Sequence, residues 1–86
     1  MKNKEYYYVP YSTNSSSEFK KICKKIFGSV RGIRKDRFAV DVDGSTIQRF
    51  KIKNQEIVVI DDYDFGYIYI NSDIDLKDLF GKSLAA

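Results

Sequence analysis

The fold of this 86-residue chain is decided by residues 38–70, which read FAVDVDGSTIQRFKIKNQEIVVIDDYDFGYIYI. Apolar residues here alternate with polar ones, or form short apolar runs, over lengths typical of β-strands. Asp43-Gly44 has the composition of a hairpin turn, and Asn54-Gln55 turns the chain a second time. We predict four strands joined by short connections into an antiparallel meander, at residues 38–42, 46–53, 56–61 and 67–70.

The segment before the meander predicts an amphipathic helix that covers one face of the sheet. Ser15 and Glu18 match a capping box at its start, and Gly28 or Gly32 is expected to end it. The stripe of apolar residues at helical spacing consists of Phe19, Ile22, Cys23, Ile26, Phe27 and Val30.

Two further elements complete the predicted order β-α-β-β-β-β-α. The tyrosine-rich residues 4–9 are expected to form a strand, and Ser72-Asp73 is expected to cap a short helix that runs through Phe80. Residues 82–86 are expected to fray. The predicted fold class is therefore α+β in a single domain of residues 1–86. An antiparallel meander of four to five strands has one face covered by an amphipathic helix, as a two-layer sandwich or a small curved barrel.

The composition favours a protein of the cytoplasm. Cys23 is the single cysteine, so no disulfide forms within the chain, and residues 1–6 lack the apolar run of a signal peptide. No apolar run approaches the length that spans a membrane. The abundance of Lys, Ile, Asp, Tyr and Asn indicates a low-GC bacterium, or a phage of one, as the source.

The residues predict a protein that is not an enzyme and that holds no cofactor or metal. The chain has no His, and Cys23 lies on the apolar stripe, where cysteine is more often a small core residue than a nucleophile. Acidic residues cluster at 61–64, but an EF-hand loop that starts at Asp62 would place Tyr67 where glycine is required. We therefore assign this cluster to a turn, and a hydrolase that uses it is the least favoured hypothesis.

Charge is distributed unevenly along the chain. Residues 1–53 carry 13 Lys and Arg against 5 Asp and Glu, whereas residues 54–86 carry 2 against 7. Most of the positive charge lies in residues 20–37, where Asp36 is the single acid, and such a cluster suits phosphate or an acidic protein surface. Its cations are Lys20, Lys21, Lys24, Lys25, Arg31, Arg34, Lys35 and Arg37, and Arg49, Lys51 and Lys53 add outward positions on a predicted strand.

Two functions fit these features. We favour a small binding protein that associates stoichiometrically with another protein as a cytosolic regulator or inhibitor, directed at a host protein if the source is a phage. Its partner contacts are assigned to the eight clustered cations together with Tyr6, Tyr8 and Tyr11. The alternative is nonspecific binding of nucleic acid, in which the cations contact phosphates and the tyrosines stack on bases. A homodimer through an unpaired strand edge is a further alternative.

Overall fold

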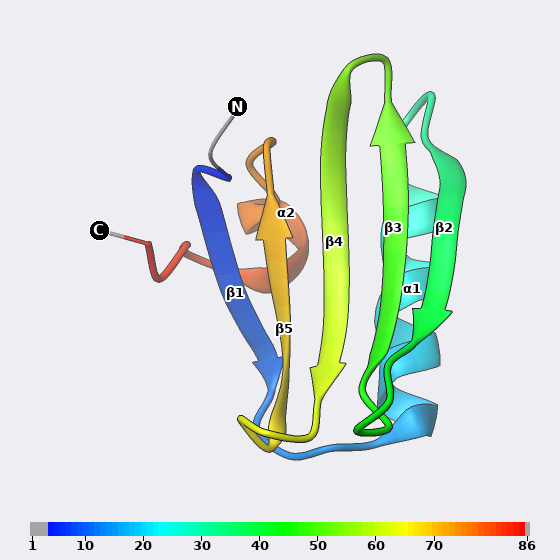
Figure 1. Cartoon of the computed structure of the whole chain (residues 1–86). Helices are drawn as coiled ribbons and strands as arrows, with labels where there is room; N and C mark the ends of the chain where they lie inside the picture. Colours follow the sequence, from blue (N-terminus) through cyan, green and yellow to red (C-terminus); the bar gives the residue numbers. More distant parts are fainter. Residues whose placement is uncertain (1–3, 86) are drawn as a thin grey trace.

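Figure 1 shows the computed structural model, which describes residues 4–85 as one five-stranded antiparallel sheet with two helices behind it. From one edge to the other, the sheet consists of β1 (Tyr6–Tyr11), β5 (Tyr67–Ser72), β4 (Gln55–Asp62), β3 (Thr46–Ile52) and β2 (Arg34–Val40). The helix α1 (Ser16–Ser29) connects β1 to β2, and the single turn α2 (Lys77–Phe80) follows β5. The predicted α+β fold is confirmed. Because β1 and β2 lie at opposite edges, the sheet is open and is not a barrel.

Four residues lie outside the described part of the chain. Residues 1–3 belong to the segment considered for a signal peptide, and Ala86 is the last residue of the predicted tail. Neither helix among residues 4–85 has the length and hydropathy that a membrane crossing requires.

The core lies between the sheet and the helices. The helix α1 begins as predicted, because Ser15 Oγ accepts a hydrogen bond from the Glu18 N–H at 3.2 Å. It runs past Gly28 and ends at Ser29, and Gly32 takes a φ of 77° in the turn that follows. Alternate residues of the strands face the helices, as predicted for residues 46–53. The core comprises Tyr8, Phe19, Ile22, Ile26, Phe50, Ile57, Val59, Ile68, Ile70 and Leu76.

The two edges of the sheet differ in what covers them. Along β1, the Leu84 N–H donates to the Tyr7 carbonyl at 2.7 Å, and the Tyr7 N–H donates to Ser83 Oγ at 2.9 Å. The prediction that residues 82–86 fray is therefore wrong for Ser83 and Leu84. Along β2, no strand among residues 4–85 pairs with the outer side.

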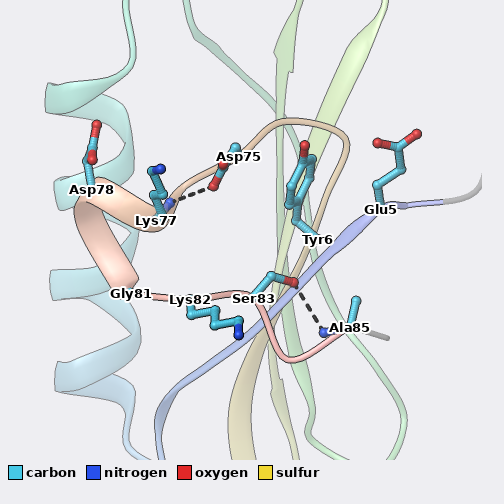
Figure 2. A pocket seen from close by; sticks show the side chains of 9 residues that line it. All are labelled: Glu5, Tyr6, Asp75, Lys77, Asp78, Gly81, Lys82, Ser83 and Ala85. Carbon is cyan, nitrogen blue, oxygen red and sulfur yellow. Dashed lines mark hydrogen bonds between the residues drawn. The ribbon is translucent and has the colours of Figure 1, made fainter.

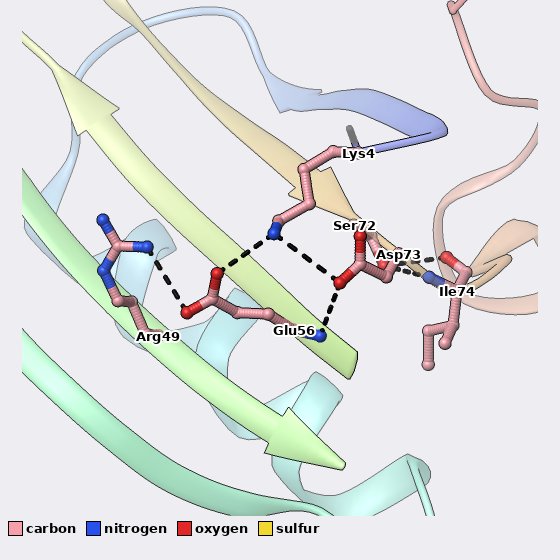
Figure 3. A network of polar contacts seen from close by, with 6 residues as sticks. All are labelled: Lys4, Arg49, Glu56, Ser72, Asp73 and Ile74. Atoms are coloured by element: carbon pink, nitrogen blue, oxygen red, sulfur yellow. Dashed lines mark hydrogen bonds and ion pairs between the residues drawn. The ribbon is translucent and has the colours of Figure 1, made fainter. Parts of the chain in front are cut away.

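The helix α2 is shorter than predicted, and Asp73, which was expected to cap it together with Ser72, makes contacts elsewhere. The Glu56 N–H donates to Asp73 Oδ2 at 2.8 Å, and Lys4 Nζ lies 3.0 Å from Glu56 Oε1 and 3.6 Å from Asp73 Oδ2 (Figure 3). Arg49 Nη1, at 3.4 Å from Glu56 Oε2, completes the network. The predicted helix cap at this position is wrong, and Arg49 is paired with an acid rather than added to the basic cluster.

Candidate functional site

The strand β2 is exposed along its whole length. Every one of its residues is exposed, and it pairs on one side only, with β3. A bulge interrupts this pairing, since Asp36 and Arg37 together oppose Arg49 alone. The strand begins four residues before its predicted start at Phe38, so Arg34, Lys35 and Arg37 lie on an edge strand and not in a loop.

The backbone of β2 has groups that point away from the sheet. The Asp41 N–H donates to the Ser45 carbonyl at 2.7 Å, at the point where β2 turns into β3. In an antiparallel ladder, residues that bond to the neighbouring strand alternate with residues whose backbone groups point away from it. The alternation from Asp41 directs the N–H and C=O of Val40 and Phe38 away from β3, on the open side of the strand.

A groove of about 310 Å³ lies between α1 and β2, and we call it the β2 groove. The aromatic residues Phe27 and Phe38 line it and are 45% and 59% exposed. Lys20, Lys24 and Lys35 also line it, and its described lining contains no acidic residue. Lys35 Nζ lies 5.2 Å from the centre of the Phe27 ring, a cation–π contact. The groove therefore combines apolar surface with positive charge.

Cys23 lies in the wall of the β2 groove, half-buried against the core. Burial raises the pKa of its thiol to about 11, because the charged thiolate is poorly solvated there, and Lys35 opposes this shift only in part. A thiol with such a pKa is protonated at neutral pH, which fits a packing role.

The lysines of α1 divide between two sides of the helix. Lys20 and Lys24 line the β2 groove, whereas Lys21 and Lys25 line a separate hollow beside α2. Lys25 Nζ lies 5.1 Å from the centre of the Phe80 ring on that second side. The four lysines of the predicted cluster that belong to α1 therefore border two different hollows. The predicted cations on the β2 side are Lys20, Lys24, Arg34, Lys35 and Arg37, and Arg31 is exposed in the turn before β2.

The tyrosines assigned to partner contact do not join these cations. Tyr8 is 1% exposed, and its hydroxyl accepts a hydrogen bond from the buried Leu76 N–H at 2.7 Å. Its assignment to partner contact is wrong, because it lies on the covered face of β1. Tyr6 lies on the same face and is partly buried, and Tyr11 is 37% exposed. All three belong to β1, at the edge of the sheet opposite β2.

Tyr6 also borders an open pocket of about 560 Å³ between β1, α2 and the C-terminal segment (Figure 2). Its lining mixes acidic groups such as Asp75 with cations such as Lys77 and Lys82. Asp75 Oδ1 already accepts the Lys77 N–H at 2.9 Å. This mixture of charges favours no particular class of ligand.

The sheet face opposite α1 carries an aromatic cluster that was not singled out from the sequence. Tyr67 and Tyr69 alternate with buried isoleucines along β5, and Tyr67 stacks on Phe65 with ring centres 5.7 Å apart. The Tyr7 and Tyr69 ring centres are also 5.7 Å apart, and burial raises the pKa of both hydroxyls to about 12. The Tyr-Ile-Tyr-Ile alternation is the signal that places these rings on one face.

The acidic turn makes contacts within the chain. Asp62 Oδ1 accepts the Asp64 N–H at 2.8 Å and the Phe65 N–H at 3.1 Å, and Asp62 Oδ2 accepts the Tyr69 hydroxyl at 3.2 Å. Asp43, from the β2–β3 turn, brings a third carboxylate within 4.8 Å of Asp62 and Asp64. The hydrogen bonds confirm the predicted turn role of Asp62.

Comparison of the chain with protein-family models, with curated proteins and with solved structures finds no match. Function is therefore inferred from the geometry of β2 and its groove.

Proposed function

We propose that this protein is a non-enzymatic binding protein that associates stoichiometrically with another protein through β2 and the β2 groove. The observation that carries the proposal is the difference between the two sheet edges. The chain's own C-terminal segment is hydrogen-bonded to β1 at Tyr7, whereas β2 has no strand on its outer side among residues 4–85. A bare edge strand is a template on which a partner segment can pair.

Exposed apolar side chains beside this edge support the same surface. Alternating apolar residues of a strand usually face a core, but Phe38 and Val40 are 59% and 63% exposed. Phe38 borders the β2 groove beside α1, where Phe27 is also exposed. Exposed apolar residues that gather on one side of a small domain are typical of an interaction surface.

The proposed setting is the cytoplasm, where the protein would act as a regulator or inhibitor encoded by a low-GC bacterium or its phage. The single cysteine supports a reducing compartment, and the Lys- and Ile-rich composition supports the source. A host protein is the expected partner if the gene is carried by a phage.

Affinity capture with a matched pair of variants tests the proposal. Phe38→Ser removes an apolar side chain beside β2, and Phe65→Ser removes one of equal exposure, 59%, from the opposite sheet face. Tagged wild-type chain and both variants are incubated with lysate of the organism that carries the gene, and the captured protein is then purified and titrated. We expect a partner with a fixed molar ratio that Phe38→Ser loses and Phe65→Ser retains. Equal capture by both variants, or no stoichiometric partner, would refute the proposal.

A second candidate function is binding of single-stranded nucleic acid in the β2 groove. Two exposed aromatic rings and three lysines line this groove. Unpaired bases can stack on such rings while their phosphates bind the lysines. Fluorescence anisotropy with labelled oligothymidylate and RNA at low and physiological salt tests it. Binding that falls steeply with salt supports this candidate, and an unchanged anisotropy at low salt eliminates it.

A further inference from the structure

We infer that the β2 edge and the β2 groove receive an acidic, extended segment of the partner protein, which adds to the sheet as a sixth strand beside β2. This inference rests on the proposed function, because it specifies the part of the partner that is bound and its chemistry.

The first step concerns the backbone. Phe38 and Val40 direct their N–H and C=O groups away from β3, so an added strand can form two-way hydrogen bonds with each of them. Before them, the bulge at Asp36 and Arg37 breaks the regular alternation. The part of β2 that suits strand addition is therefore its second half, next to the exposed apolar side chains.

The second step concerns the side chains of the added strand. Successive side chains of a strand point to opposite faces of the sheet. Every second side chain of the added strand would therefore lie on the α1 side, next to Phe38 and the β2 groove. There it would meet Phe27 and the three groove lysines, Lys20, Lys24 and Lys35. Carboxylates at some of these positions would neutralise the lysines, and apolar side chains at others would cover the phenylalanines.

Charge favours a partner segment over a second copy of this chain. A second copy that paired antiparallel through Phe38 and Val40 would place its own α1 on the same side of the extended sheet, so two grooves lined by lysines would face each other. Like charges brought together across an interface are destabilising. An acidic strand is instead attracted to the lysines of the β2 groove. Its binding should weaken as the salt concentration rises, because salt screens these charges.

A displayed library of random twelve-residue peptides, selected on the full chain and counter-selected on Val40→Pro, tests the inference. Proline removes an N–H that points away from β3, so the β2–β3 pairing is retained. We expect enriched peptides in which Asp or Glu alternates with apolar residues. Synthetic versions should bind the wild-type chain about tenfold more tightly than Val40→Pro, since one backbone hydrogen bond is lost.

A second pair of variants does not depend on the fold of β2. Lys24 and Lys25 are adjacent exposed residues of α1 on different sides of the helix, and Lys24→Glu and Lys25→Glu change the net charge equally. The selected peptides should bind Lys24→Glu about fivefold or more weakly than they bind Lys25→Glu, because only the first places an acid in the groove.

Several results would overturn the inference. They are selection of neutral or basic peptides, absence of enrichment, and equal binding to both lysine variants. A concentration-dependent dimer that Val40→Pro abolishes would also overturn it, because the occupant would then be a second copy. If a full-length partner is captured in a Phe38-dependent way and no acidic peptide is enriched, the inference fails while the proposed function stands. If no partner is captured either, both fail.

Discussion

Replacing Tyr8 by Phe should destabilise the fold because it removes one acceptor from a buried site. The Tyr8 hydroxyl lies 2.7 Å from the Leu76 nitrogen, whose N–H it accepts, and 3.3 Å from Asp75 Oδ1. In Tyr8→Phe the Leu76 N–H stays buried without an acceptor. An unsatisfied buried donor costs about 1–3 kcal/mol. The ring remains, so no large cavity forms and the loss is assigned to this one group.

Urea denaturation followed by circular dichroism measures this loss, since the chain has no Trp to report by fluorescence. With a denaturant slope near 1 kcal/mol/M for a small domain, the midpoint should fall by about 1–3 M. Tyr7→Phe is the matched control: its hydroxyl lies 3.3 Å from the Tyr67 hydroxyl on a partly exposed face, and its loss should cost less than about 0.5 kcal/mol. If Tyr8→Phe unfolds at the same urea concentration as the wild-type chain, or both variants lose the same stability, the reasoning fails.

Three further outcomes are expected. Burial alone raises the pKa of Glu56, but its ion pairs with Lys4 and Arg49 outweigh burial and lower the pKa below the ordinary 4.5. Glu56→Gln should therefore lose stability to urea at pH 7 relative to the wild-type chain, and the difference should vanish as the pH falls through the lowered pKa; a difference that does not decrease as the pH is lowered would contradict this. Iodoacetamide should modify Cys23 about a hundredfold more slowly in the native chain than in urea, given its pKa of about 11, and equal rates would contradict the burial. Deletion of residues 82–86 uncovers the edge of β1 and should cause self-association in sedimentation, whereas a chain ending at residue 84 should behave as the full chain does.

The elements that depend on local sequence signals could be predicted. Ser15 caps α1 because its side chain satisfies an amide three residues on, and Phe50 faces the core because the strand alternates around it. The start of β2 could not be predicted in the same way. Residues 34–37 have no apolar alternation, and they are strand because Arg34 and Lys35 pair with β3. At an exposed edge, backbone pairing and not burial stabilises the strand. Such pairing leaves no recognisable pattern of apolar residues in the sequence.

The candidate site shows that alternating side chains in a strand do not by themselves reveal which face of the sheet is buried. The sequence places Tyr6 and Tyr8 together on one face of β1, but alternation does not specify which face the helices cover. Tyr8 is therefore predicted at the surface although it belongs to the core. The same uncertainty applied to Phe38 and Val40. Their alternation is typical of a half-buried strand, yet both side chains are largely exposed. The extent of cover depends on where a helix crosses a sheet, which is a property of tertiary packing.

The division of charge along the chain has a spatial consequence for binding. The cations of β2 and of the adjoining side of α1 lie at one edge of the sheet, and acidic residues such as Asp75 and Asp78 lie with α2, behind the strands of the opposite edge (Figure 1). The cations of the β2 groove then attract an acidic partner toward the same edge that the bare backbone leaves available. The lysines of the β2 groove also disfavour pairing with a second copy, because two lysine-lined grooves would then face each other. Positive charge beside an unpaired edge thus disfavours a second copy of this chain and favours an acidic segment. In this way an exposed edge can be specific for one kind of partner.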